Sequence, residues 1–141
     1  MANIESFNFP DDLYYTKDHV WVKVEGKVVT IGLTQFGQDV AGDILFVEAP
    51  AEGREIAQDE AFMSMESGKW VGRVKAPLSG KLLESNSELE WESDLVNSDP
   101  YGTGWLTKLE ASNLDELKSL FRSDSPDFSS FIAEEKKKYK K

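Results

Sequence analysis

Two residue types that carry much of protein chemistry are nearly missing from this chain. Its 141 residues include no cysteine and one histidine. The lack of cysteine excludes disulfides, thiolate nucleophiles and cysteine-bound metals, and one imidazole cannot build a multi-histidine metal cage. Basic residues are also scarce, with 16 Lys and Arg against 26 Asp and Glu and a net charge of -10. Because such a surface repels phosphate backbones and anionic lipid, no nucleic acid or membrane partner is expected.

Long apolar runs are missing as well. The first residues lack the basic start and apolar stretch of a secretory signal, and no segment approaches the length of a membrane span. We therefore expect a cytoplasmic protein. The chain length suits one domain with a single core, and we expect a monomer.

What the sequence does contain is a series of short strand-like segments. Alternating β-branched residues on both sides of Glu25-Gly26 predict a hairpin over residues 20–33. Thr34 and Gly42 bracket a short helical turn. Further strands are predicted at 44–48, 61–65, 71–76, 81–84 and 105–109. This spacing indicates a β-sandwich or flattened barrel. Its core aromatics are predicted to be Trp21, Phe36, Phe46, Phe62 and Trp105.

The last third of the chain has helical patterns. Ser112 precedes an apolar stripe from Leu114 to Phe121, and Ser125-Pro126 precedes a second stripe. We expect a β-domain over residues 1–110, C-terminal helices packed on it over 111–135, and a basic flexible tail at 136–141.

The candidate site is a lysine between two predicted strands. Glu66-Ser67-Gly68-Lys69 lies between the segments 61–65 and 71–76, so Lys69 is expected at a tight turn that projects into water. A protruding lysine on a rigid β-scaffold suits covalent attachment of a swinging cofactor. An ordinary surface lysine is the alternative interpretation.

Further motifs follow one another in a distinctive order. They are Tyr15-Thr16, His19-Val20-Trp21, Val29–Asp39, Gly42-Asp43, Pro77–Gly80, Val96-Asn97, Pro100-Tyr101 and Gly104-Trp105. In this order they resemble the H protein of the glycine cleavage system, a relative of the lipoyl and biotinyl carrier domains. The resemblance implies a mainly β fold of the lipoyl/biotinyl hammerhead type with short helices.

The same resemblance implies a function and a site. It places lipoate in amide linkage on Lys69, makes the chain a non-catalytic carrier, and places Glu66, Gly53 and Gly80 in the recognition pattern of the lipoylating enzyme. An equal alternative is that Gly53 and Gly80 are turn glycines that the β-fold itself requires. Ser67, Gly68 and Trp70 border the lysine, and we expect Trp70 to pack against the resting arm.

The implied partners follow from the family's reaction cycle. A lipoate ligase or lipoyl transferase would attach the arm. Glycine decarboxylase would load it, an aminomethyltransferase would unload it, and a flavin dehydrogenase would reoxidise it.

The sequence departs from the family at the positions that surround the arm. Val20 replaces a glutamate, Val40 replaces a histidine, and Gly68 and Trp70 flank the lysine. The apolar exchanges favour H-like lipoate-binding proteins of sulfur oxidation, which work with heterodisulfide-reductase-like complexes. The alternative is a divergent glycine cleavage H protein.

Other classes of function are more remote. A biotin carrier usually has methionine on both sides of its lysine, which Gly68 and Trp70 do not provide. An unmodified interaction module requires that Lys69 is never acylated. We interpret His19 as a packed, hydrogen-bonded residue rather than a general base. The scattered acids Asp43, Glu48, Glu52, Glu55 and Glu60 are interpreted as solvated, with no metal site.

Overall fold

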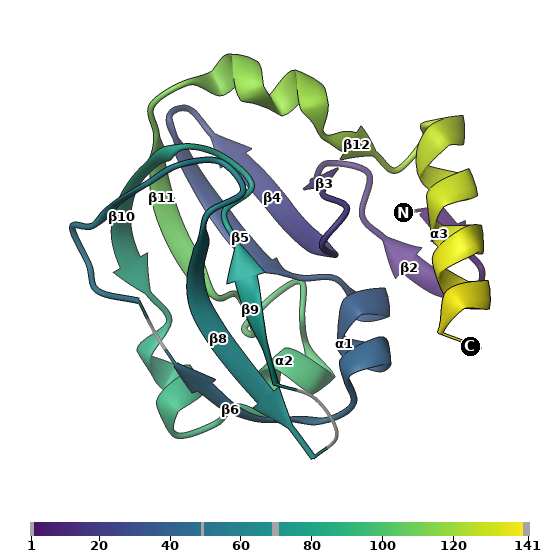
Figure 1. Cartoon of the computed structure of the whole chain (residues 1–141), viewed down its shortest axis with the longest axis horizontal. Helices are drawn as coiled ribbons and strands as arrows, with labels where there is room; N and C mark the ends of the chain where they lie inside the picture. Colours follow the sequence, from purple (N-terminus) through teal and green to yellow (C-terminus); the bar gives the residue numbers. More distant parts are fainter. Residues whose placement is uncertain (1, 49, 69–70, 140–141) are drawn as a thin grey trace.

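The computed structural model describes residues 2–48, 50–68 and 71–139 and is mainly β (Figure 1). A seven-stranded antiparallel sheet contains, in spatial order, β12 (Phe121–Arg122), β3 (Tyr14–Tyr15), β4 (Val20–Glu25), β5 (Val28–Leu33), β11 (Thr107–Ala111), β10 (Gly80–Ser85) and β7 (Glu55–Ile56). A three-stranded sheet contains β6 (Ile44–Glu48), β8 (Ala61–Ser67) and β9 (Val71–Lys75). A terminal ribbon pairs β1 (Ala2–Ile4) with β2 (Phe7–Phe9). The predicted mainly β class is confirmed, but the described sheets do not close into a barrel.

The predicted hairpin over residues 20–33 is confirmed. It consists of β4 and β5, paired from Val20 and Leu33 to Glu25 and Val28. Gly26 occupies the turn with φ of 69°, a left-handed conformation that costs glycine little. The predicted strands after residue 43 are confirmed as β6, β8, β9, β10 and β11, with ends that differ by one or two residues.

The short helical turn after this hairpin is confirmed as α1 (Gln35–Ala41). The Thr34 hydroxyl accepts a hydrogen bond from the Gly37 N–H, and Gly42 ends the helix with φ of 86°. A 3-10 turn, η1 (Ser87–Glu90), and a short helix, α2 (Leu95–Ser98), follow β10. No helix in the described part of the chain is long and apolar enough to cross a membrane.

The prediction of the first of the two C-terminal helices is wrong. Residues Leu114–Ser119 form a 3-10 turn, η2, which is capped by Asn113 rather than Ser112 and buries no side chain. The leucines recur every third residue, which matches the 3-10 period rather than the α-helical one. Phe121 belongs to β12, the edge strand beside β3.

The second C-terminal helix is confirmed as α3 (Pro126–Lys138), with proline in its first turn and Phe128 and Ile132 buried. It continues through Lys138, so the basic segment 136–141 begins within the helix and not after it. Figure 1 shows α3 lying beside the N-terminal ribbon, and Lys136 lies 3.9 Å from the Glu5 carboxylate.

Two clusters of buried side chains make up the core. The larger one joins the seven-stranded and three-stranded sheets through residues such as Ile31, Met65 and Leu109, all with no exposed surface. The smaller one is aromatic and sits under α3, where the Tyr15 and Phe128 rings stack 4.9 Å apart.

Three of the five predicted core aromatics are confirmed. Trp21, Phe36 and Phe62 are buried, and Trp105 is partly buried against the aromatic cluster. Phe46 was predicted to be buried and is 54% exposed. The reason is a register shift between Ile44 and Phe46, since a bulge interrupts the alternation that would turn Phe46 inward.

Gly32 gives a stability test of this core. A Cβ at Gly32 would lie 2.3 Å from the Trp21 ring, so we expect Gly32→Ala to destabilise the fold by about 1–3 kcal/mol in urea unfolding. The colliding atoms, Nε1, Cε2 and Cζ2, lie beyond the reach of a leucine side chain. The penalty should therefore shrink in a Trp21→Leu background, and an unchanged penalty would contradict this contact.

Candidate functional site

The hairpin that carries the predicted attachment lysine joins β8 and β9. Its last described pair is Glu66 with Val71, and the end of β8 lies at the lower edge of the molecule in Figure 1. Lys69 and Trp70 lie outside the described residues, so their predicted placement and the predicted contact of Trp70 stay predictions.

The described residues of this connection are well defined. Glu66 is exposed, and a Cβ at Gly68 would meet no described atom within 4 Å. The Ser67 hydroxyl donates a hydrogen bond of 2.5 Å to the Ala41 carbonyl at the end of α1. This bond ties the base of the hairpin to the neighbouring helix, so Glu66 and Gly68 face solvent from a fixed position.

Gly53 and Gly80 lie elsewhere in the fold. The Gly53 N–H donates to the Leu82 carbonyl at 2.7 Å, and Gly53 has φ of 82°. Gly80 begins β10, where a Cβ would lie 2.2 Å from the Glu110 carbonyl oxygen. Both glycines therefore have structural reasons in or beside the seven-stranded sheet, whereas Glu66 and Ser67 belong to β8 of the other sheet and Gly68 follows it. Their predicted role in recognition stays a prediction.

A cleft lies beside the hairpin, with a volume of about 550 Å³. We call it the α3 cleft. It is lined by Lys17, Asp18, His19, Val20, Leu33, Gly37, Val40, Ala41, Met65, Arg73, Val74, Glu135, Lys138 and Tyr139. Met65, Arg73 and Val74 come from β8 and β9, so the hairpin strands themselves form one wall. The size and the mixture of apolar walls with a few polar groups suit a small-molecule ligand.

Most charged residues of the α3 cleft lie at its rim, and one lies deeper. Lys17, Asp18, Arg73 and Lys138 are exposed at its rim. Among the described charged residues that line the cleft, Glu135 is the one that is not exposed, with 14% of its side chain accessible. The interior is therefore apolar with one carboxylate.

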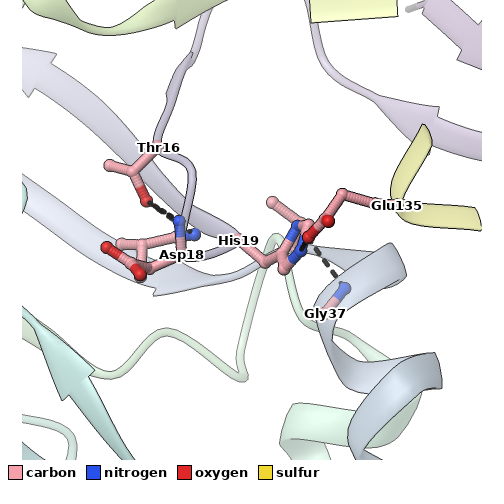
Figure 2. Close-up of polar contacts among 7 residues, drawn as sticks. Thr16, Asp18, His19, Gly37 and Glu135 are labelled. Carbon is pink, nitrogen blue, oxygen red and sulfur yellow. Dashed lines mark hydrogen bonds and ion pairs between the residues drawn. The ribbon is translucent and has the colours of Figure 1, made fainter. Parts of the chain in front are cut away.

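The Glu135 carboxylate is held by the only histidine of the chain. Figure 2 shows the two side chains pointing toward one another, and the His19 Nε2 atom lies 2.8 Å from Glu135 Oε1. Because a carboxylate accepts, Nε2 carries the proton of this bond. The His19 ring also lies between the Phe36 and Phe131 rings, at 4.9 and 5.6 Å. The predicted interpretation of His19 as a packed, hydrogen-bonded residue fits these contacts.

Local backbone geometry places His19 there. His19 has φ of 65° in the turn before β4, and the Thr16 hydroxyl accepts hydrogen bonds from the Asp18 and Val20 N–H groups. A Cβ at Gly37 would lie 2.7 Å from the His19 Cβ, so glycine lets α1 approach this turn closely. Burial lowers the pKa of His19, against the opposing influence of Glu135.

Glu135 is the site residue that sequence reasoning missed. It lies 116 positions from His19 along the chain, so no local motif joins the two. The pattern of apolar residues in α3 could have indicated that Glu135 has a partner. Glu135 is one heptad after Phe128, on the same apolar face of α3, and a carboxylate on such a face calls for a partner.

Comparison with known proteins identifies the family. The family model for the glycine cleavage H-protein matches residues 13–132. The glycine cleavage system H protein of Symbiobacterium thermophilum is 46% identical over 127 residues, covering 90% of this chain and 98% of that protein. The chain belongs to the glycine cleavage H-protein family. The H protein of Staphylococcus saprophyticus is likewise 46% identical, over 89% of this chain and 98% of the relative.

Structural comparison agrees. The crystal structure of a glycine cleavage system H protein from Mycobacterium marinum has a TM-score of 0.70 at 29% identity and covers 79% of this chain and 97% of that chain. Members of the family carry lipoate covalently on a lysine and are not themselves enzymes, so this chain is a non-catalytic lipoate carrier.

The pH dependence of stability tests the His19 environment. Since burial lowers its pKa in the folded state, the unfolded chain binds the proton first, and stability should fall as the pH drops below about 6.5. In urea unfolding from about pH 7 to about pH 5.5, we expect the wild type to lose more stability than His19→Asn. Asparagine tolerates the left-handed backbone and does not titrate. A wild type that gains stability on acidification would show that Glu135 outweighs burial.

Proposed function

We propose that this chain is the H protein of a glycine cleavage system, with lipoate on Lys69 and an aminomethyl group as its cargo. The observation that carries the proposal is the family match over residues 13–132, which includes Glu66–Lys69 between β8 and β9. The comparisons name glycine cleavage H proteins, so they do not support the leading sequence hypothesis of a sulfur-oxidation carrier. They favour the alternative.

The described residues that precede Lys69 in the sequence, and the cleft beside β8 and β9, support a lipoyl arm. When bound, lipoate supplies a disulfide that can open to take up the aminomethyl group and electrons. The end of β8 lies at an edge of the molecule (Figure 1), and Glu66 and Gly68 are exposed to a modifying enzyme. Among the apolar residues that line the α3 cleft, Val40 is partly exposed and offers apolar surface for an aliphatic chain.

The α3 cleft also suits an amine cargo. Val20 stands where the family has a glutamate, which would leave the cleft without its usual carboxylate. Glu135 supplies a carboxylate in the same cleft, and His19 orients it through the 2.8 Å hydrogen bond. A neutral His19 leaves the negative charge of Glu135 available to balance a protonated amine. Glu135 lies beyond the part of the chain that the family model matches.

The partners of the proposed function are glycine decarboxylase, the aminomethyltransferase and a lipoate-attaching enzyme. Tethering the cargo raises its effective concentration at each partner, so weak and transient encounters are sufficient. Reoxidation by a flavin dehydrogenase, a monomeric state and a cytoplasmic location stay predictions.

Lipoylation at Lys69 is tested by intact-protein mass after co-expression with a lipoate ligase. We expect a single lipoyl increment in the wild type, because Glu66 and Gly68 present the turn to solvent. The increment should be absent in Lys69→Arg and retained in Lys75→Arg, a lysine of the same hairpin. A biotin increment, or none, would contradict the proposal.

The cargo is tested by incubating the lipoylated chain with glycine decarboxylase and glycine. We expect the wild type to accept the aminomethyl group. At the same glycine concentration, the fraction of Glu135→Gln that is loaded should be about tenfold lower, since one charge-assisted contact is lost. Glutamine keeps the hydrogen bond from His19, so the fold should be unchanged. Glu134→Gln, the exposed neighbour on α3, is the matched control. Normal reduction of the arm without any loading would instead support the sulfur-carrier reading.

A further inference from the structure

The N-terminal ribbon of β1 and β2 lies outside the residues that the family model matches, which begin at residue 13. Glu135 lies outside them as well, because the match ends at residue 132. Figure 1 shows the ribbon beside α3, although the two come from opposite ends of the chain. β1 contacts α3 and β2 contacts α1, so the ribbon joins the two helices that line the α3 cleft.

The Glu135 carboxylate sits in a part of α3 that needs support. Glu135 belongs to the last turn of the helix, which ends at Lys138. Helix ends fray, because their last carbonyls have no partner within the helix. A carboxylate in this turn keeps a fixed position only if contacts from outside the helix hold the turn.

Glu5 provides one of these contacts. The Lys136 Nζ atom lies 3.9 Å from the Glu5 carboxylate and donates to the Glu5 carbonyl at 3.5 Å. Glu5 and Ser6 connect β1 to β2 with left-handed backbone, at φ of 53° and 75°. Hairpin turns of this kind are usually built from asparagine and glycine, so glutamate and serine are strained there. The contact with α3 helps to hold this strained turn.

Phe7 supports the His19 ring from the side of α1. The Phe7 ring packs edge-on against Phe36, with the ring centroids 5.0 Å apart. The Phe36 ring in turn lies 4.9 Å from the His19 ring. The Asn8 N–H donates to the Gln35 side chain at 2.7 Å, at the start of the same helix. β2 therefore fixes the ring against which His19 packs.

We propose that the N-terminal ribbon is a positioning element for the Glu135 carboxylate. Glu5 holds the last turn of α3, and Phe7 holds the α1 ring beneath His19. Together they keep His19 and Glu135 at hydrogen-bond distance inside the α3 cleft. The consequence for an amine cargo rests on the proposed function, whereas the placement of the carboxylate can be measured without any cargo.

His19 makes this placement measurable, because it is the only histidine of the chain. Long-range proton–nitrogen correlation spectra of the full-length chain report its tautomer and its pKa. We expect a single tautomer in the wild type, with the proton on Nε2. Phe7→Ala should populate both tautomers and raise the pKa of His19 toward about 6.5, since water then reaches the ring. Glu5→Lys should do the same, and it removes no buried side chain.

The direction of the pKa shift distinguishes packing from charge. Burial has the largest influence on the pKa of His19 and lowers it. The added positive charge of Glu5→Lys would by itself lower this pKa further, so a rise reports loss of burial. Both variants retain the charged residues around His19, which are Lys17, Asp18, Arg73, Glu135 and Lys138.

The glycine loading assay links the ribbon to the carboxylate. At the same glycine concentration, Phe7→Ala should lower the loaded fraction about threefold, because Glu135 then meets the amine only part of the time. In a Glu135→Gln background, Phe7→Ala should have no further effect, since the group that the ribbon positions is already lost. A general structural defect would instead add to the effect of Glu135→Gln. Intact mass confirms that every variant is lipoylated before loading.

Matched controls separate positioning from general effects of substitution. Asn3→Ala changes an exposed side chain of the same ribbon, and Glu25→Lys makes the same charge change on β4. Neither should alter the His19 tautomer or the loaded fraction. Lys136→Glu combined with Glu5→Lys exchanges the two charges and should restore the single tautomer.

Three results would overturn the positioning proposal. One is a wild type in which both tautomers of His19 are populated. Another is an unchanged tautomer and pKa in both Phe7→Ala and Glu5→Lys. The third is an effect of Phe7→Ala on loading that is as large in Glu135→Gln as in the wild type. If Glu135→Gln is loaded like the wild type, the proposed role of Glu135 in cargo binding fails, and the tautomer of His19 still decides whether the ribbon positions it.

Discussion

The one-sided burial of the three-stranded sheet is the constraint on which the functional features of this protein depend. Met65 and Val74 point into the core shared with the seven-stranded sheet, while Glu66 and Arg73 are exposed. Because side chains alternate along a strand, this burial fixes the register of β8 and β9. It therefore fixes the pairing of Glu66 with Val71 at the end of the hairpin, on either side of the predicted attachment lysine in the sequence.

The same sheet separates two surfaces with different chemistry. On the side of α1 and α3 it forms a wall of the α3 cleft, through Met65, Val74 and the Arg73 side chain. Along β6 it carries Leu45 and Phe46, which the bulge turns outward. Both surfaces are therefore built on strands of the sheet whose hairpin contains the Glu66-Ser67-Gly68-Lys69 motif in the sequence.

The C-terminal helix links the ends of the chain to the α3 cleft. Phe128 stacks on Tyr15 and packs edge-to-face on Phe9, so α3 is held by the first strands of the protein. One heptad later, Glu135 reaches His19 at the cleft. In the proposed function, Glu135 from the far end of the chain takes the place of the carboxylate that the family has next to Trp21. In the sequence alone, valine at position 20 argues for a different cargo. With Glu135 in the α3 cleft, that argument is weaker.

Much of the fold was predictable because its signals are local. The β4–β5 hairpin, the Thr34 cap of α1 and the proline start of α3 follow from residues that are close together in the chain. The failures also have local causes. The leucines after Asn113 have a spacing of three and form a 3-10 turn, and a bulge exposes Phe46 despite its apolar character.

By itself, the sequence determined the family, the hairpin with its Glu66-Ser67-Gly68-Lys69 motif, and the exclusion of thiol chemistry, because each depends on residue identity at fixed spacing. Only the tertiary structure decided which carboxylate enters the α3 cleft and which apolar residues meet at the surface. Glu135 with His19, and Ser93 with Leu45, are pairs from distant segments, and only packing of the sheets and helices brings them together.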